Sequence, residues 1–200
     1  MPYSIPTAPC QATLEIKKSQ FLGFGYPIDS REQAMFHVEQ LHTRYADARH
    51  ICWAYIIGEP TNTTSAGFDD DGEPSGTAGK PILNVLQYKA LSNCLIAVVR
   101  YFGGIKLGAG GLTRAYSGTA QAVVENMTLT PFIATATLTI STDFANESFI
   151  RHLLAGFHVT ILTAEYSKVV RLTVEIAEPI IQRLTEKIGF YGVIKSVIDD

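Results

Sequence analysis

Two glycine-rich connections, each followed directly by a helical pattern, constrain the fold more than any other feature of this chain. The first, DDDGEPSGTAGKP, covers residues 69–81, and the second, GGIKLGAGGLTR, covers residues 103–114. Glycine permits positive φ in tight turns, and the unpaired amides at the start of a helix attract anions. The sequence therefore predicts that both connections turn backbone amides toward an anionic ligand.

The pattern of residues 1–130 predicts an α+β domain. Ser30 is a suitable N-cap for an amphipathic helix, and the run from Cys94 to Phe102 is the strongest strand signal. Residues 59–79 lack apolar periodicity and are expected to form a long loop. The expected elements are a hairpin or bent strand at 12–28, helices at 31–45, 81–91 and 112–127, and strands at 50–57 and 94–102.

Residues 131–200 follow a second pattern, which begins after Thr130 and Pro131. Proline lacks a backbone donor and keeps the preceding residue out of the helical region, which favours a domain boundary here. The order that follows is strand 133–141, helix 144–157, strand 159–164, strand 169–176, helix 179–188 and strand 192–198. This βαββαβ order predicts a ferredoxin-like second domain, so two domains are expected, 1–130 and 131–200.

Composition and cysteine spacing argue against several classes of protein. Uninterrupted apolar runs such as Cys94–Val99 are much shorter than the roughly 20 residues of a membrane helix. The N-terminus has neither the basic start nor the apolar stretch of an export signal. Cys10, Cys52 and Cys94 are odd in number with no CxxC pair, which argues against a disulfide framework or a zinc site. We expect a cytoplasmic protein that binds no membrane, metal or cofactor.

The net charge of −3 argues against a domain that binds nucleic acid through its bulk charge. Any contact with RNA must use a local cationic patch, because phosphate affinity depends on the charges that the contact neutralises. Lys80, Lys106 and Arg114 lie within the two glycine-rich connections and are the expected phosphate contacts. DNA is not an expected partner.

The end of the first connection, GTAGKP, resembles a Walker A loop but does not meet its requirements. The glycine needed five positions before Gly79 is Pro74, and the hydroxyl residue needed after Lys80 is Pro81. That hydroxyl would bind magnesium, so the sequence argues against a P-loop nucleotidase. Anion binding by free amides remains one interpretation, and a tight loop whose glycines only permit positive φ remains the other.

Four carboxylates belong to the same connection, at Asp69, Asp70, Asp71 and Glu73. Clustered carboxylates bind magnesium or calcium and also act as general acids and bases, but the D-x-D-x-D-G calcium spacing is absent. A second interpretation is a solvated acidic turn whose aspartates cap backbone amides. A third is an ion pair with Arg100 or Lys106, which would join the two connections.

Arg100 interrupts a strand that otherwise has the composition of one buried on both faces. A buried arginine usually has a carboxylate or phosphate partner, so a structural salt bridge and a ligand contact both account for its position. The histidines fit no HExxH or HxH spacing, and Ser117 lacks the first glycine of a nucleophile elbow. The sequence therefore offers no constellation of catalytic residues.

The segment DDDGEPSGTAGKP, followed by AVVRYFGGIKLGAGGLTRAYS, resembles the signature of the YigZ and IMPACT family. The resemblance implies a first domain similar to the second domain of small-subunit ribosomal protein five. It also implies a second domain similar to a ferredoxin-like domain of elongation factor G. Both analogies point to RNA or the ribosome. The positions that match the motif are Asp71, Gly72, Glu73, Pro74, Gly76, Thr77, Gly79, Lys80, Pro81, Arg100, Gly103, Gly104, Gly108, Gly110 and Gly111.

We hypothesise a non-catalytic protein that binds RNA or ribosome-associated factors and regulates translation. The alternative is an enzyme that acts on a phosphorylated small molecule or nucleotide, with a metal held by the acidic residues Asp69, Asp70, Asp71 and Glu73. The expected anion-binding or nucleic-acid-binding residues are Gly76, Thr77, Gly79, Lys80, Arg100, Gly103, Gly104, Lys106, Gly108, Gly110, Gly111 and Arg114.

Overall fold

Strand β6 (Cys94–Tyr101) lies at the centre of a five-stranded antiparallel sheet, which confirms the strongest strand prediction. Every residue of β6 except Tyr101 is buried, including Arg100. The computed structural model describes residues 3–59 and 62–196. The strand order is β2-β3-β6-β4-β5, with β2 at Cys10–Ile16, β3 at Ser19–Pro27, β4 at His50–Glu59 and β5 at Asn62–Asp69.

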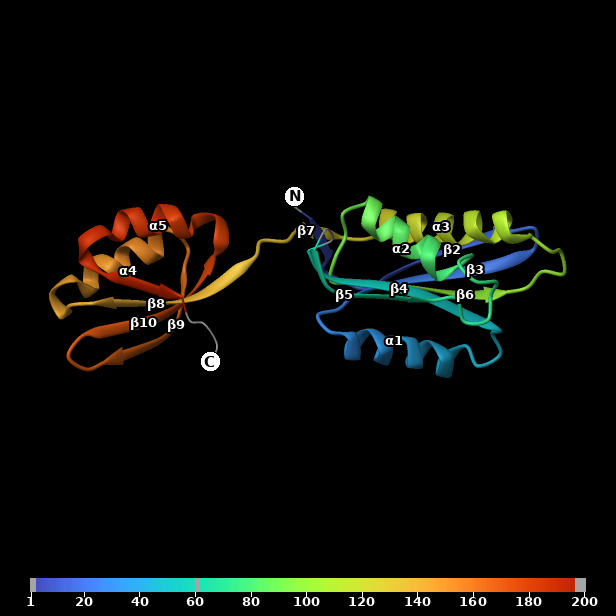
Figure 1. Ribbon diagram of the computed structural model, residues 1–200. Coiled ribbons are helices and arrows are strands. Elements are labelled where there is room, and N and C mark those ends of the chain that lie inside the picture. Colours follow the sequence, from blue (N-terminus) through green and yellow to red (C-terminus); the bar gives the residue numbers. More distant parts are fainter. Residues whose placement is uncertain (1–2, 60–61, 197–200) are drawn as a thin grey trace. The chain divides into compact units, whose positions relative to one another are not determined.

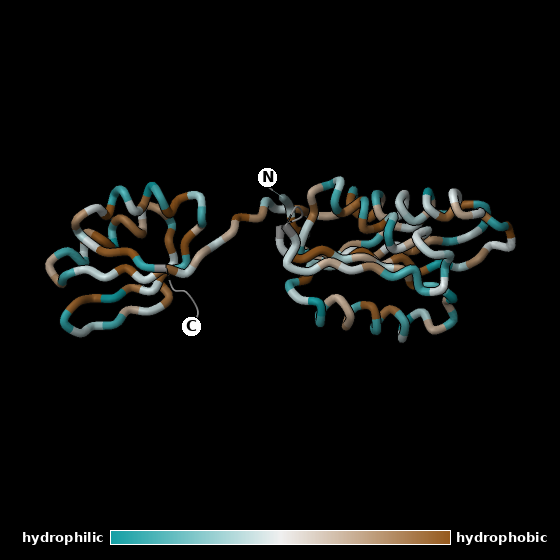
Figure 2. Tube along the Cα trace, in the orientation of Figure 1, coloured by the Kyte–Doolittle hydropathy of each residue, from teal (hydrophilic) through white to brown (hydrophobic). Residues whose placement is uncertain are grey.

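Helices cover both faces of this sheet in the first unit, residues 1–132 (Figure 1). Helices α2 (Gly79–Tyr88) and α3 (Ala109–Glu125) pack on one face, and α1 (Arg31–Arg44) packs on the other. Hydrophilic and hydrophobic segments alternate along α1, as expected for a helix with one buried face (Figure 2). The predicted N-cap is confirmed, because Ser30 Oγ accepts a hydrogen bond from the Gln33 amide.

The start of the chain forms a hairpin, in which β2 and β3 are joined through Lys17 and Lys18 at φ values of 48° and 64°. A second antiparallel pair brings the two ends of the first unit together. It consists of β1 (Ser4–Pro6) and β7 (Leu129–Pro131). Thr130 and Pro131, at which a boundary was expected, therefore lie in a strand that pairs within the first unit.

The predicted loop at residues 59–79 is wrong in its first half, because β5 forms there and pairs with β4. Trp53 lies opposite Asp69 and Ile57 lies opposite Ser65 in this register. β5 is an edge strand of mostly polar composition, NTTSAGFD, so no apolar run reveals it in the sequence. Backbone pairing with β4 forms this strand against its weak local propensity.

The second unit, residues 133–200, has the predicted βαββαβ order. Its sheet order, β11-β8-β10-β9, with every neighbouring pair antiparallel, confirms a ferredoxin-like fold. Alternate residues of β10 are buried in a core shared with both helices. Its main elements are β8 (Thr135–Thr142), α4 (Glu147–Gly156), β9 (Thr160–Tyr166), β10 (Val170–Ala177), α5 (Ile181–Ile188) and β11 (Val193–Ser196). Across the described ranges of both units, no helix is long and apolar enough to cross a membrane.

Candidate functional site

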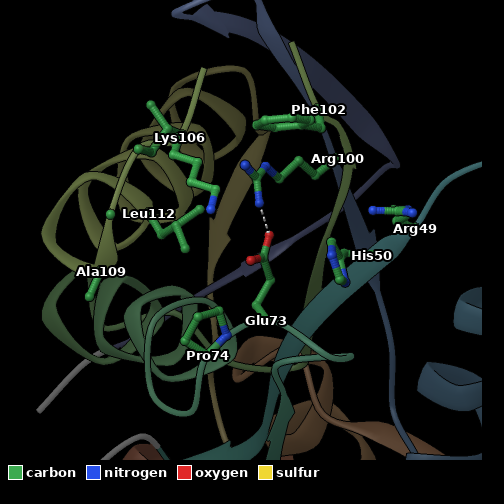
Figure 3. Close-up of a pocket in the computed structure, with 11 residues that line it drawn as sticks. Arg49, His50, Glu73, Pro74, Arg100, Phe102, Lys106, Ala109 and Leu112 are labelled. Atoms are coloured by element: carbon green, nitrogen blue, oxygen red, sulfur yellow. Dashed lines mark hydrogen bonds and ion pairs between the residues drawn. The ribbon is translucent and has the colours of Figure 1, made fainter. Parts of the chain in front are cut away.

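A pocket of about 380 Å³ opens in the first unit where β6 ends and α3 begins (Figure 3). The first glycine-rich connection contributes Glu73 and Pro74 to its wall, and the second contributes residues 106–109 and Leu112. The two connections therefore border one pocket. The remaining lining residues are Arg49, His50, Arg100 and Phe102.

Arg100 is the most buried cation of this pocket, with only 8% of the residue exposed. Its Nη1 donates to Oε1 of Glu73, and the guanidinium lies 5.6 Å from the Phe21 ring centroid and 5.7 Å from that of Phe102. Its Nε is buried and has no hydrogen-bond partner among the residues that the structure describes. The guanidinium therefore forms the salt bridge that the sequence allowed, and its buried Nε remains an unused donor.

Glu73 connects Arg100 to a buried polar network. Its Oε1 also accepts a hydrogen bond of 2.8 Å from the Tyr116 hydroxyl. The Cys52 thiol lies 3.3 Å from that hydroxyl and 3.0 Å from the backbone oxygen of Asp70. Burial raises the pKa values of both Cys52 and Tyr116, so each keeps its proton and can donate at neutral pH. The Arg100–Glu73 ion pair is thus connected, through Glu73, to a buried network of neutral donors.

The start of α2 differs from the open anion site that was expected there. Asp70 Oδ1 accepts from the amides of Ala78 and Gly79 at 3.0 and 2.8 Å, and its Oδ2 accepts from Gly76 at 2.7 Å. The carboxylate of this chain therefore occupies the position that a bound phosphate would take. Gly76 and Gly79 hold Asp70 and present no free amide cradle.

The neighbouring candidates of the first connection also have structural partners. Thr77 is buried and donates from Oγ1 to the Pro74 backbone oxygen at 2.6 Å. Gly79 packs so closely that a Cβ there would lie 2.5 Å from the Asp69 backbone oxygen. Lys80 is exposed and lies outside the residues that line the pocket.

The other aspartates of the acidic run hold the loop, as the capping interpretation required. Asp69 Oδ1 accepts from the Asp71 amide at 2.6 Å, and Asp71 Oδ2 accepts from the Ile51 amide at 2.6 Å. The His50 Nδ1 lies 2.7 Å from the Asp71 backbone oxygen. In the part of the chain that the structure describes, no three His, Cys, Asp or Glu residues are arranged to hold a metal ion.

The second connection leads to an open helix start. Gly108 has a φ of 70° and is the N-cap of α3, and the described residues supply neither a side-chain cap nor an acidic residue in the first turn. Ala109 lines the pocket, so the first amides of α3 lie beside it. The partial positive charge of this helix start therefore adds to that of Arg100 and Lys106.

The other residues of the second connection are placed differently. Gly103 packs against the β2–β3 turn, because a Cβ there would lie 2.0 Å from the Lys18 carbonyl carbon. Gly110 and Gly111 belong to the first turn of α3, beyond the loop in which they were expected. The remaining candidates outside the pocket lining are Gly104 and the exposed Arg114.

Comparison with known proteins identifies the chain by both of its units. Residues 17–124 match the Impact N-terminal domain, and residues 140–189 match a domain of unknown function, DUF1949. The chain belongs to the IMPACT family. An IMPACT family member of Haemophilus influenzae is 34% identical over 189 residues, which cover 92% of each chain. The IMPACT family member YigZ of Escherichia coli is 35% identical over 188 residues, covering 94% of this chain and 92% of YigZ.

The fold is also similar to a crystal structure of a hypothetical protein. That chain is 31% identical, with a TM-score of 0.73, and the match covers 100% of this chain and 98% of the other. The α+β class and the two-domain composition agree with these matches.

Arg49, His50 and Phe102 line this pocket but were not among the expected site residues. His50 and Arg49 reach the pocket because His50 pairs with Arg100 across β4 and β6. Neither belongs to the glycine-rich motif, and the register of β4 is not visible in the sequence. Phe102 was expected as the last residue of the strand at 94–102, and the structure places it directly after β6.

The buried thiols give a direct check on this packing. In the native protein at about pH 8, Cys10 is expected to react with an alkylating reagent well before Cys52 and Cys94. Cys52 and Cys94 are fully buried, and burial raises their pKa values, whereas Cys10 is partly exposed. Mass spectrometry of quenched samples measures the order, with urea-unfolded protein as the control. Equal native rates at Cys10 and Cys52 would contradict the burial of the network.

Proposed function

We propose that this protein binds RNA, free or within the translation machinery, through the pocket between β6 and α3. It acts without catalysing a reaction, in the cytoplasm, and regulates translation through this contact. The observation that carries the proposal is Arg100, a buried cation that lines the pocket beside Lys106 and the open start of α3, and whose Nε has no partner among the described residues. Membership of the IMPACT family also supports the proposal of RNA binding.

The charges around the pocket suit a phosphate group. Arg49, Arg100 and Lys106 contribute three positive side chains, and Glu73 contributes one negative side chain. Guanidinium groups and helix N-termini are both preferred partners of phosphate oxygens. Because the whole chain has a net charge of −3, this local excess restricts phosphate binding to one place instead of spreading it over the surface.

A double variant, Arg49→Ala with Lys106→Ala, is expected to bind RNA more weakly than the unmodified protein. The dependence of its affinity on salt concentration is also expected to be smaller. Both residues are exposed, so the fold should tolerate the change. Loss of two phosphate contacts should lower the slope of log affinity against log salt by about 1.4 for single-stranded RNA. Fluorescence anisotropy with a labelled oligonucleotide over a salt series measures this slope.

The matched control is Arg31→Ala, which removes an exposed cation at the start of α1, on the opposite face of the sheet. This variant should bind RNA as the unmodified protein does. Undiminished binding in the Arg49→Ala, Lys106→Ala double variant would argue against the pocket. Failure of the unmodified protein to bind any RNA would contradict the proposed function itself.

A second candidate function is that of an enzyme acting on a phosphorylated small molecule or nucleotide. The volume of the pocket, about 380 Å³, falls within the range of small-ligand sites and favours this candidate. A metal in the acidic loop has less support, since Asp69, Asp70 and Asp71 all accept backbone hydrogen bonds. Thermal shifts with nucleotides and sugar phosphates, followed by analysis for product, would separate this candidate from RNA binding.

A further inference from the structure

We propose that the pocket selects a terminal phosphate, the monoester at the end of an RNA strand or of a free nucleotide, over the internal phosphodiesters of a strand. This inference rests on the proposed function and specifies which RNA group the pocket receives. Three features of the described residues support it: the burial of Arg100, the charge of the pocket and the position of Phe102.

The burial of Arg100 limits how a phosphate can reach it. Only 9% of its side chain is exposed, and its Nη1 is already occupied by Glu73. An internal phosphodiester reaches the protein with the strand continuing on both sides, and it is usually met by exposed lysine and arginine side chains. A terminal monoester extends from the strand on one side only. It can therefore enter a pocket of about 380 Å³ and approach the part of the Arg100 side chain that lines it.

The charge of the pocket matches a monoester better than a diester. The three cations Arg49, Arg100 and Lys106 exceed the single carboxylate of Glu73 by two positive charges. A phosphate monoester carries about 1.5 to 2 negative charges at pH 7, whereas an internal diester carries one. The first turn of α3 adds partial positive charge without an acidic residue to offset it. A terminal monoester therefore neutralises the two excess positive charges of the pocket more completely than an internal diester does.

Phe102 is placed to contact the nucleotide that carries this phosphate. Its side chain lines the pocket, lies over the Arg100 guanidinium and remains 52% exposed (Figure 3). An exposed aromatic ring beside a cationic site is a typical stacking platform for a base of any sequence. Terminal phosphate and terminal base would thus be bound together, the phosphate at Arg100 and the base at Phe102.

The test compares RNA oligonucleotides of one sequence that differ only at their ends. One carries a 5′-phosphate, one a 3′-phosphate and one a hydroxyl at both ends, and anisotropy measures their affinities for the full chain at one salt concentration. We expect one phosphorylated form to bind at least about tenfold more tightly than the hydroxyl form, because of its additional charge. A nucleoside monophosphate added as competitor shows whether the terminal nucleotide is sufficient.

Variants assign this preference to the pocket. The Arg49→Ala, Lys106→Ala double variant should lose the preference, and Arg31→Ala should keep it. Phe102→Ala should weaken binding of the phosphorylated RNA about tenfold. Phe102→Tyr keeps the aromatic ring, so it should bind this RNA as tightly as the unmodified protein does. The Trp53 fluorescence spectrum, from the single tryptophan of the chain, confirms that each variant is folded.

Two results would overturn the inference while leaving RNA binding in place. One is equal affinity for phosphorylated and hydroxyl-ended RNA, with both sensitive to the loss of Arg49 and Lys106. The other is a phosphate preference that the double variant retains. Absence of binding to every RNA, with or without a terminal phosphate, would overturn the inference and the proposed function together.

Discussion

Replacing Arg100 with methionine is expected to lower the free energy of unfolding of the first unit by about 3 to 5 kcal/mol. Methionine fills most of the space between Phe21 and Phe102 but leaves the Glu73 carboxylate buried with no positive partner. Truncating one member of a buried ion pair is costly for this reason, whatever the net contribution of the intact pair. The network to Tyr116 would remain, but it supplies only a neutral donor.

Urea unfolding of the full chain followed by Trp53 fluorescence measures this loss, because the single tryptophan lies in β4 of the first unit. Arg31→Met is the control, since it removes an exposed arginine and should change stability little. Adding Glu73→Gln to Arg100→Met removes the unpaired charge and should recover a substantial part of the loss. An Arg100→Met variant as stable as the Arg31→Met control would show that the Glu73 charge is not buried in solution.

Replacing Asp70 with alanine is expected to cost about 2 to 4 kcal/mol of stability in the same assay. The change leaves the amides of Gly76, Ala78 and Gly79 without their common acceptor. Asp70 is partly exposed, so water can reach some of these amides and limits the loss. Asp69→Ala, which removes one hydrogen bond at an exposed residue, should cost less than about 1 kcal/mol and serves as the graded comparison.

The Asp70→Ala variant has a second expected property that a purely steric role would not produce. With the carboxylate absent, the start of α2 becomes an anion site, so added sulfate or phosphate should raise the stability of this variant more than that of the Asp69→Ala variant. Equal salt responses in the two variants would contradict the assignment of Asp70 as the anion that fills the helix start.

Hydrophobic periodicity was sufficient to predict β6, α1 and the order of elements in the second unit. These elements bury one face or, in β6, both faces, so their burial is recorded in the spacing of apolar residues. β5 was missed because an edge strand is stabilised by backbone pairing with β4, which leaves no pattern in the side chains. Local sequence therefore predicts the elements that form the core better than those that border it.

The sequence singled out some of the residues that line the pocket but not how they are arranged. The sequence drew attention to Arg100, Lys106 and Glu73, which the structure brings to one pocket. It did not distinguish the two helix starts, because only the three-dimensional path of the loop shows that the Asp70 side chain folds back onto α2. It also gave no indication of Arg49, since the pairing of β4 with β6 that places it is a long-range contact.

The start of α2 is occupied by the Asp70 carboxylate, whereas the start of α3 has no acidic side chain. One acidic residue therefore distinguishes a helix start that is capped from within the chain from one that can accept an external anion. A carboxylate positioned ahead of α3 as Asp70 is positioned ahead of α2 would satisfy its amides from within the chain. One acidic residue is thus enough to decide whether a helix start is capped from within the chain or open to an external anion. A designed substitution that supplied such a residue would block the anion site at α3 without changing the sheet.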